Sequence, residues 1–135
     1  MERLVSFKAI KRYDFVLTDG DDAEQGHIAF GDPATGMVTI TPGGIALGLF
    51  AATMTGDGVA KITVALWDEI FAYWFDNDTG TPVVAADMFK PAYAVSDVAV
   101  STAGTVELGV ILDLDATQGV LVYATMPASA LVAGP

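Results

Sequence analysis

Short runs of apolar, β-prone residues alternate with clusters of turn residues along almost the whole chain. Glycine, proline, aspartate and asparagine dominate these clusters because their backbones or side chains favour turns. The strands that this pattern predicts are 4–10, 15–17, 27–30, 37–41, 45–54, 61–67, 70–75, 92–95, 98–100, 106–115 and 120–124. Many short strands at such spacing are typical of a barrel or a sandwich.

No segment has the 3.6-residue period of a long helix. Residues 84–89 are expected to form a single helical turn, which ends before Pro91 because a residue that precedes proline avoids helical dihedral angles. The sequence therefore predicts an all-β fold, a small β-barrel or sandwich of short antiparallel strands with one short helical turn near 84–89.

The clearest alternation lies in 106–115. Five aliphatic residues fall on one face of this predicted strand, and the residues between them fall on the other face. The first set is Val106, Leu108, Val110, Leu112 and Leu114; the second is Glu107, Gly109, Ile111, Asp113 and Asp115. A period of two predicts a half-buried strand, and residues 120–124 are expected to return as its hairpin partner.

The chain of 135 residues fits one β domain, expected at 13–126, with a basic arm at 1–12 and an apolar, flexible tail at 127–135. Four of the six basic residues lie in the arm: Arg3, Lys8, Lys11 and Arg12. The stretch from Tyr13 to Ala60 contains no lysine or arginine. The arm is either a solvated strand end or a segment that docks on an acidic neighbour, such as the next copy of this chain.

Composition excludes several classes of function. The chain has no cysteine, which rules out disulfide frameworks, thiol catalysis and cysteine-based zinc sites. A net charge of -11 repels phosphate backbones, so no nucleic-acid partner is expected. The N-terminal residues lack the apolar segment of a secretory signal, and the longest apolar run, 43–54, is too short to span a bilayer as a helix, so no membrane partner is expected either.

Aromatic residues are concentrated near the middle of the chain, at Trp67, Phe71, Tyr73, Trp74 and Phe75. Because they alternate along a strand, they do not all face one core. The group is either a strand buried on both sides or a subunit contact, since tryptophan and tyrosine are favoured anchors of interfaces. The residues expected at an oligomer interface are Trp67, Phe71, Tyr73 and Trp74.

Three features suggest chemistry, and each also has a simpler structural interpretation. Asp78-Thr79-Gly80 matches the core of the aspartic protease motif, but Asp76 and Asn77 precede it where that motif needs apolar residues, which favours a β-turn. The acidic residues Asp19, Asp21, Asp22 and Glu24 form either an adventitious cation site or a solvated turn, and Asp76 and Asp78 leave the same two possibilities. The single histidine, His27, is expected to be an ordinary half-buried strand residue. No catalytic residue, metal ligand or cofactor is predicted.

Several phrases of the sequence resemble phage head decoration proteins, also called capsid cement proteins. They are the stretch from Thr55-Gly-Asp-Gly to Val64, the strand Ile70-Phe-Ala-Tyr-Trp-Phe with its acidic turn, the segment Val83-Val-Ala-Ala-Asp-Met-Phe-Lys-Pro to Val100, and the final hairpin from Leu108 to Tyr123. The resemblance covers roughly residues 50–124. Phe89 departs from the pattern, in which glycine is common at this position.

The resemblance implies a small β-barrel-like subunit, often a homotrimer, that binds the outside of a phage capsid and stabilises the shell. Its partners would be the major capsid protein and its own copies, and its location would be the capsid surface of a virion made in the host cytoplasm. The alternatives are another virion subunit (tail, spike or head completion), a dimeric aspartic protease that uses Asp78, and a carbohydrate-binding β module.

Overall fold

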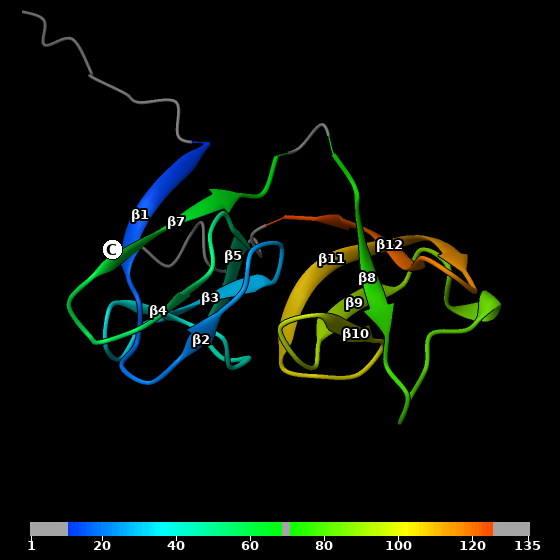
Figure 1. Cartoon of the computed structure of the whole chain (residues 1–135). Helices are drawn as coiled ribbons and strands as arrows, with labels where there is room; N and C mark the ends of the chain where they lie inside the picture. The colour runs from blue at the N-terminus through cyan, green and yellow to red at the C-terminus, as the bar shows by residue number, and fades with distance from the viewer. Residues whose placement is uncertain (1–10, 69–70, 126–135) are drawn as a thin grey trace, which may run out of the picture.

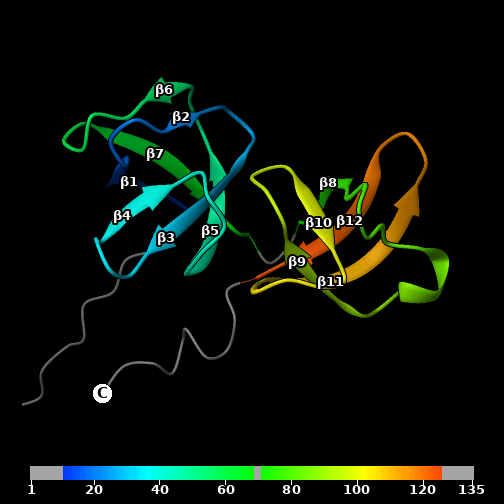
Figure 2. The ribbon, with the colours of Figure 1, turned by 90° about the horizontal axis from the view of Figure 1, so that it is seen from below.

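A computed structural model describes residues 11–68 and 71–125, which form two β units that lie side by side (Figures 1 and 2). The first unit contains β1 (Arg12–Val16), β2 (Asp22–Ala23), β3 (Ile28–Asp32), β4 (Met37–Thr39), β5 (Ile45–Phe50), β6 (Met54–Thr55) and β7 (Lys61–Leu66). The second contains β8 (Tyr73–Asn77), the 3-10 turn η1 (Ala85–Asp87), β9 (Pro91–Ala94), β10 (Ala99–Ser101), β11 (Val106–Asp115) and β12 (Gly119–Ala124). The predicted all-β fold with a barrel and one short helical turn is confirmed.

Part of the predicted organisation lies outside the described residues. Residues 1–10 of the basic arm and the tail at 127–135 are not described, so these predictions and the strand expected at 4–10 stay predictions. Arg12, the last residue of the predicted arm, is the first residue of β1.

The first unit consists of a five-stranded antiparallel sheet with the order β1-β7-β5-β3-β4 and a two-stranded sheet of β2 and β6. The five-stranded sheet curls until its two outer strands meet, where Leu17 bridges Val38. Thr18 secures this contact, since both its backbone N–H and its Oγ1 donate to the Val38 carbonyl, at 3.0 Å and 2.9 Å. The concave face encloses a cluster of buried apolar residues: Leu17, Ala23, Ala29, Val38, Phe50, Ile62 and Val64.

The second unit is a closed barrel with the order β10-β8-β12-β11-β9. All neighbouring strands are antiparallel except β8 and β10, which run parallel. The barrel encloses apolar side chains from every one of its strands, which include Phe75, Val100, Leu108 and Val122. Closure gives each strand a neighbour on both sides, so the faces of this unit, rather than strand edges, are what it presents to partners.

The alternation predicted for 106–115 is wrong beyond Leu108. Val106 and Leu108 are buried as expected, but Ile111 is also fully buried, while Val110 and Leu112 are exposed. The register shifts against β9 between Glu107 and Gly109, and against β12 between Ile111 and Asp113. Each shift is a bulge, and a bulge moves the following side chains to the opposite face of the strand. Two apolar side chains therefore point outward.

The two units share a core at β3 and β5, which are buried on both faces. Ile28, Phe30 and Ala46 belong to the apolar cluster of the barrel, whereas Ala29 and Phe50 belong to the cluster of the first sheet. The backbone N–H of Ile28 also donates to the carbonyl of Asp97 in the barrel, at 2.7 Å. The units are thus joined by packing and by hydrogen bonds as well as by the chain itself.

Replacement of Gly109 tests the bulge of β11. A Cβ atom at this position would lie 1.9 Å from the carbonyl oxygen of Tyr123, so Gly109→Ala must displace β12. We expect the free energy of unfolding to fall by about 2–3 kcal/mol in chemical denaturation, because overpacked backbones cannot relax locally. Gly43→Ala is the control, since its Cβ meets nothing within 4 Å. Equal stability of the two variants would contradict the strand geometry.

Candidate protein-binding surface

The four aromatic residues predicted at an oligomer interface fall into two pairs. The first pair, Trp67 and Tyr73, packs within the chain at the junction of the two units. The indole Nε1 of Trp67 donates to the carbonyl of Ala46 at 2.8 Å, and its ring lies 5.1 Å from that of Tyr73 and 6.1 Å from that of Phe75. The Tyr73 hydroxyl accepts the backbone N–H of Asp68 at 3.2 Å. This pair anchors the barrel against β5.

The second pair, Phe71 and Trp74, is presented to solvent. Phe71 is 55% exposed in the segment between β7 and β8, and Trp74 is 39% exposed on the outer face of β8. Alternation along β8 explains the division, because Tyr73 and Phe75 point inward and Trp74 points outward. The predicted subunit contact stays a prediction. Phe71 and Trp74 are the two of its four residues that are exposed and therefore accessible to another subunit.

A third exposed aromatic residue, Phe89, has an unusual backbone. It lies in the loop between η1 and β9 with a φ angle of 68°, the one positive φ of a residue other than glycine among the described residues. This left-handed conformation costs a residue with a side chain about 1–2 kcal/mol. Burial does not offset the cost, since the side chain is 76% exposed. Strain of this kind concentrates where a protein presents a side chain for function.

Hydrogen bonds on both sides hold Phe89 in this conformation. Its backbone N–H donates to the carbonyl of Ile111 at 2.8 Å, and the N–H of Ile111 donates to the carbonyl of Lys90 at 3.0 Å. The carboxylate of Asp87 accepts the backbone N–H of Val84 at 2.9 Å and the Lys90 ammonium at 3.1 Å. The Val84 N–H, followed by the Lys90 ammonium, lowers the pKa of Asp87. The loop is fixed in place by these contacts.

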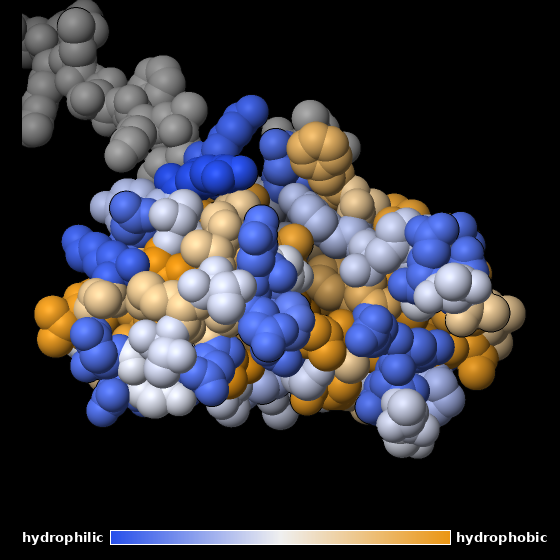
Figure 3. Space-filling model, in the orientation of Figure 1, coloured by the Kyte–Doolittle hydropathy of each residue, from blue (hydrophilic) through white to orange (hydrophobic). Residues whose placement is uncertain are grey.

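The backbone of Phe89 pairs with β11 next to two more exposed apolar residues. Its partner Ile111 is flanked on β11 by Val110 and Leu112, which the bulges turn outward. We call Phe89, Val110 and Leu112 the Phe89 patch. Apolar areas of the surface, separated by hydrophilic side chains, are visible on the face shown in Figure 3. The sequence pattern missed this patch, because it assigned Val110 and Leu112 to the core. The signal available was phenylalanine at a position where glycine is expected.

The predicted partner-binding residues of the arm are described only in part. Arg3 and Lys8 lie outside the described residues. Lys11 and Arg12 are exposed at the start of β1, where Arg12 lines a polar hollow with Tyr13, Asp14 and Lys61. Cationic side chains are therefore displayed at the point where the arm meets the first sheet.

The Asp78-Thr79-Gly80 motif is part of a hydrogen-bonded turn. The Asp78 carboxylate accepts the backbone N–H of Thr81 at 2.9 Å, and the Asp78 N–H donates to the carbonyl of Val100 at 3.0 Å. These are the contacts of an aspartate that closes a turn beside a strand. The motif therefore has the local geometry of a β-turn.

The acidic residues near the start of the chain serve structural hydrogen bonds. Asp21 accepts from the Thr39 hydroxyl at 2.6 Å, and Asp22 accepts from the Thr55 hydroxyl at 2.7 Å. The part of the chain that the structure describes holds no group of three histidine, cysteine or acidic side chains that could bind a metal ion. These carboxylates connect β2 to its surroundings.

His27 is half-buried, as predicted, and joins the two units. Its Nδ1 lies 2.9 Å from a carboxylate oxygen of Asp97, and its Nε2 lies 3.3 Å from one of Glu24. Asp97 belongs to the turn between β9 and β10 of the barrel, whereas His27 immediately precedes β3. The histidine therefore has a structural role at the same junction as Trp67.

Comparisons of the chain with protein-family models, with curated proteins and with solved structures find no match. Among the described residues, no helix is long and apolar enough to cross a membrane. A function must therefore be inferred from the described surface. Its main features are exposed aromatic side chains on the barrel unit and cationic side chains at the start of β1.

Truncation of Trp67 should destabilise the protein far more than truncation of Trp74. Trp67→Ala removes a ring that packs against two others and leaves the Ala46 carbonyl without its donor, so we expect a loss of about 3–5 kcal/mol. Trp74→Ala removes a side chain that lies on the outer face of β8 and is 39% exposed, so it should cost at most about 1 kcal/mol. Thermal unfolding of the two variants measures the difference, and similar melting temperatures would contradict the proposed division of the aromatics.

The pKa of the Asp87 carboxyl should lie below 3.8, the ordinary value for an aspartate. Because the pKa is lowered in the folded state, the carboxylate stabilises the loop at pH values above 3.8 and loses this effect as the pH falls through the folded pKa. Lys90→Ala should leave part of the shift, since the Val84 N–H is the largest single cause and stays in place. NMR titration of the carboxyl carbon measures the pKa in both chains. A return of the pKa to 3.8 in Lys90→Ala would show that the ammonium is the main cause.

Proposed function

We propose that this chain is a structural virion protein that binds the outside of a phage capsid and stabilises the shell as a decoration, or cement, protein. The observation that carries the proposal is Phe89, an aromatic side chain held outward by a strained backbone. A ring that gains nothing from burial in its own chain is suited to burial against another polypeptide.

The distribution of the other exposed apolar side chains supports the same function. Val110 and Leu112 extend the contact around Phe89, and Phe71 and Trp74 supply two further anchors on the barrel unit. Aromatic anchors surrounded by polar side chains are typical of protein interfaces. The sequence resemblance to cement proteins covers the whole barrel unit, so the two lines of support concern the same residues.

Such a protein acts mechanically. Each copy contacts neighbouring subunits of the major capsid protein and adds contact area that is lost when those subunits separate. We further propose that the copies associate as a homotrimer, because linked copies bind a repetitive shell with an avidity far above that of one contact. The acidic body and the basic arm of the chain are suited to orienting the protein on such a shell.

Phe89→Gly separates binding from folding. Glycine adopts the left-handed backbone without strain, so the variant should be as stable as the original chain or more stable by up to about 1 kcal/mol. Loss of the ring should weaken binding to shells of the cognate major capsid protein by about tenfold or more. Co-sedimentation with shells at several protein concentrations measures the affinity, and chemical denaturation measures the stability.

Val59→Ser is the matched control. Val59 is 78% exposed in the first unit, away from the Phe89 patch, so its replacement should change neither quantity. If Phe89→Gly binds shells as well as the original chain does, the Phe89 patch is not the contact. If the original chain fails to bind shells at all, the proposed function is wrong.

A further inference from the structure

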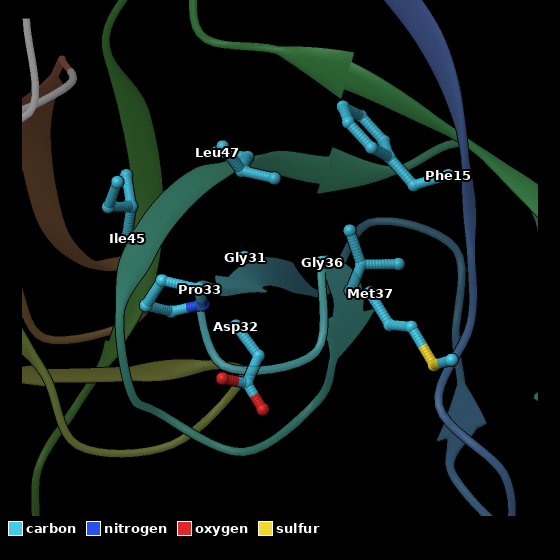
Figure 4. Close-up of a pocket in the computed structure, with 9 residues that line it drawn as sticks. Phe15, Gly31, Asp32, Pro33, Gly36, Met37, Ile45 and Leu47 are labelled. Carbon is cyan, nitrogen blue, oxygen red and sulfur yellow. The ribbon is translucent and has the colours of Figure 1, made fainter. Parts of the chain in front are cut away.

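The curled sheet of the first unit is open at one end. Beyond the bridge between Leu17 and Val38, an apolar pocket of about 180 Å³ continues the concave face of the sheet (Figure 4). Its walls are Phe15, Met37, Ile45 and Leu47, and Gly31 lies at its base. A cavity of about 150 Å³ with aliphatic and aromatic walls accommodates a benzene ring, so this pocket has room for one aromatic side chain.

A strand edge with unpaired backbone groups lies next to the pocket. Leu66 N–H donates to the carbonyl of Lys11, and Leu17 N–H donates to that of Ala60, so the odd-numbered residues of β1 are bonded to β7. In an antiparallel pair the intervening residues point their backbone groups away. Those of Arg12 and Asp14 therefore face the open side, where the described residues supply no backbone partner. An added strand would find hydrogen bonds there and a pocket for one side chain.

Charge indicates which segment fills this site. The pocket residues all come from the stretch between Tyr13 and Ala60, which lacks lysine and arginine, and Asp32 is the charged residue that lines the pocket. Residues 1–12 carry four basic side chains and one acidic one, with an apolar and aromatic core that includes Leu4, Val5 and Phe7. The tail at 126–135 is apolar but has no charged side chain. Complementarity therefore favours the arm.

The arm that fills the site is expected to come from another copy. To lie beside its own β1, the arm would need a tight hairpin just before Arg12. Two-residue hairpins depend on glycine, asparagine or aspartate, and residues 1–13 contain none of these and no proline. A second copy can present the same segment without a turn.

We propose that the pocket between β1 and the β3–β4 turn receives the N-terminal arm of a second copy, with Phe7 inserted between Phe15, Met37 and Leu47. The arm would add a strand at the free edge of β1. This head-to-tail contact uses different surfaces of the two copies, so it links them into a closed ring when the rotation between them closes. The proposal rests on the self-association included in the proposed function, and it specifies the contact.

Engineered cysteines test this contact directly, because the chain has none of its own. A full-length chain that carries Phe7→Cys is mixed with a tagged chain that carries Met37→Cys and is oxidised mildly. We expect a disulfide-linked pair of the two chains, in several-fold higher yield than with Met54→Cys in place of Met37→Cys. Met54 is the matched control, a half-buried methionine of β6 that does not line the pocket.

Three outcomes would overturn the proposal. They are equal yields with Met37→Cys and Met54→Cys, a link that forms only within a chain carrying both Phe7→Cys and Met37→Cys, and a higher yield when Leu131→Cys replaces Phe7→Cys, which would assign the pocket to the tail. Circular dichroism confirms that each variant is folded. The disulfide is measured in protein without capsid shells. A failure to form it is therefore distinguishable from a failure to bind shells.

A positive charge introduced at the pocket gives a second readout. Met37→Lys places a cation where the basic arm is expected, so it should shift the mass of the purified protein toward the monomer in light scattering, whereas Met54→Lys should not. An unchanged mass for Met37→Lys, with the fold intact, would also overturn the proposal.

Discussion

The structure depends on two strands that are buried on both faces. β3 and β5 pack against the concave core of the first sheet on one side and against the barrel on the other, through Ile28, Phe30 and Ala46. The hydrogen bond between His27 and Asp97 crosses this junction, and Trp67 packs its ring against Tyr73 and Phe75 of the barrel. A chain of this length gains most of its stability from apolar burial, so a shared core makes each unit a support for the other. The outward side chains are displayed on the surface around this shared core.

Rigidity matters for the proposed function because a cement protein resists separation of the subunits it contacts. Binding energy is retained when the contacting groups are already ordered before binding. Phe89 meets this condition, since its backbone is held by Ile111 and the loop is closed by Asp87. The N-terminal arm has a different proposed role. It is proposed to join one copy to the next, while the barrel faces join copies to the shell.

The sequence was sufficient for the fold class and for most strands, because turn residues mark strand ends in almost any context. It was not sufficient where contacts with distant parts of the chain determine which face of a strand is buried. The bulges of β11 arise from its register against two different neighbours, which no local pattern contains, so Val110 and Leu112 were assigned to the wrong face. The aromatic group could be located, but its members could not be assigned to the core or the surface, since both faces of the segment from Ile70 to Phe75 are apolar. Phe89 stood out in the sequence as a departure from the resembled pattern, but its positive φ could not be predicted because the periodicity of side chains does not reveal it.

The most direct measurement for the central claim is an electron cryo-microscopy image of cognate capsid shells saturated with this protein. The account predicts ordered density outside the shell at symmetry-related positions, with the barrel unit and its Phe89 patch against the major capsid protein. Shells that remain bare at saturating protein, or density in which the Phe89 patch faces solvent and contacts no neighbour, would contradict it.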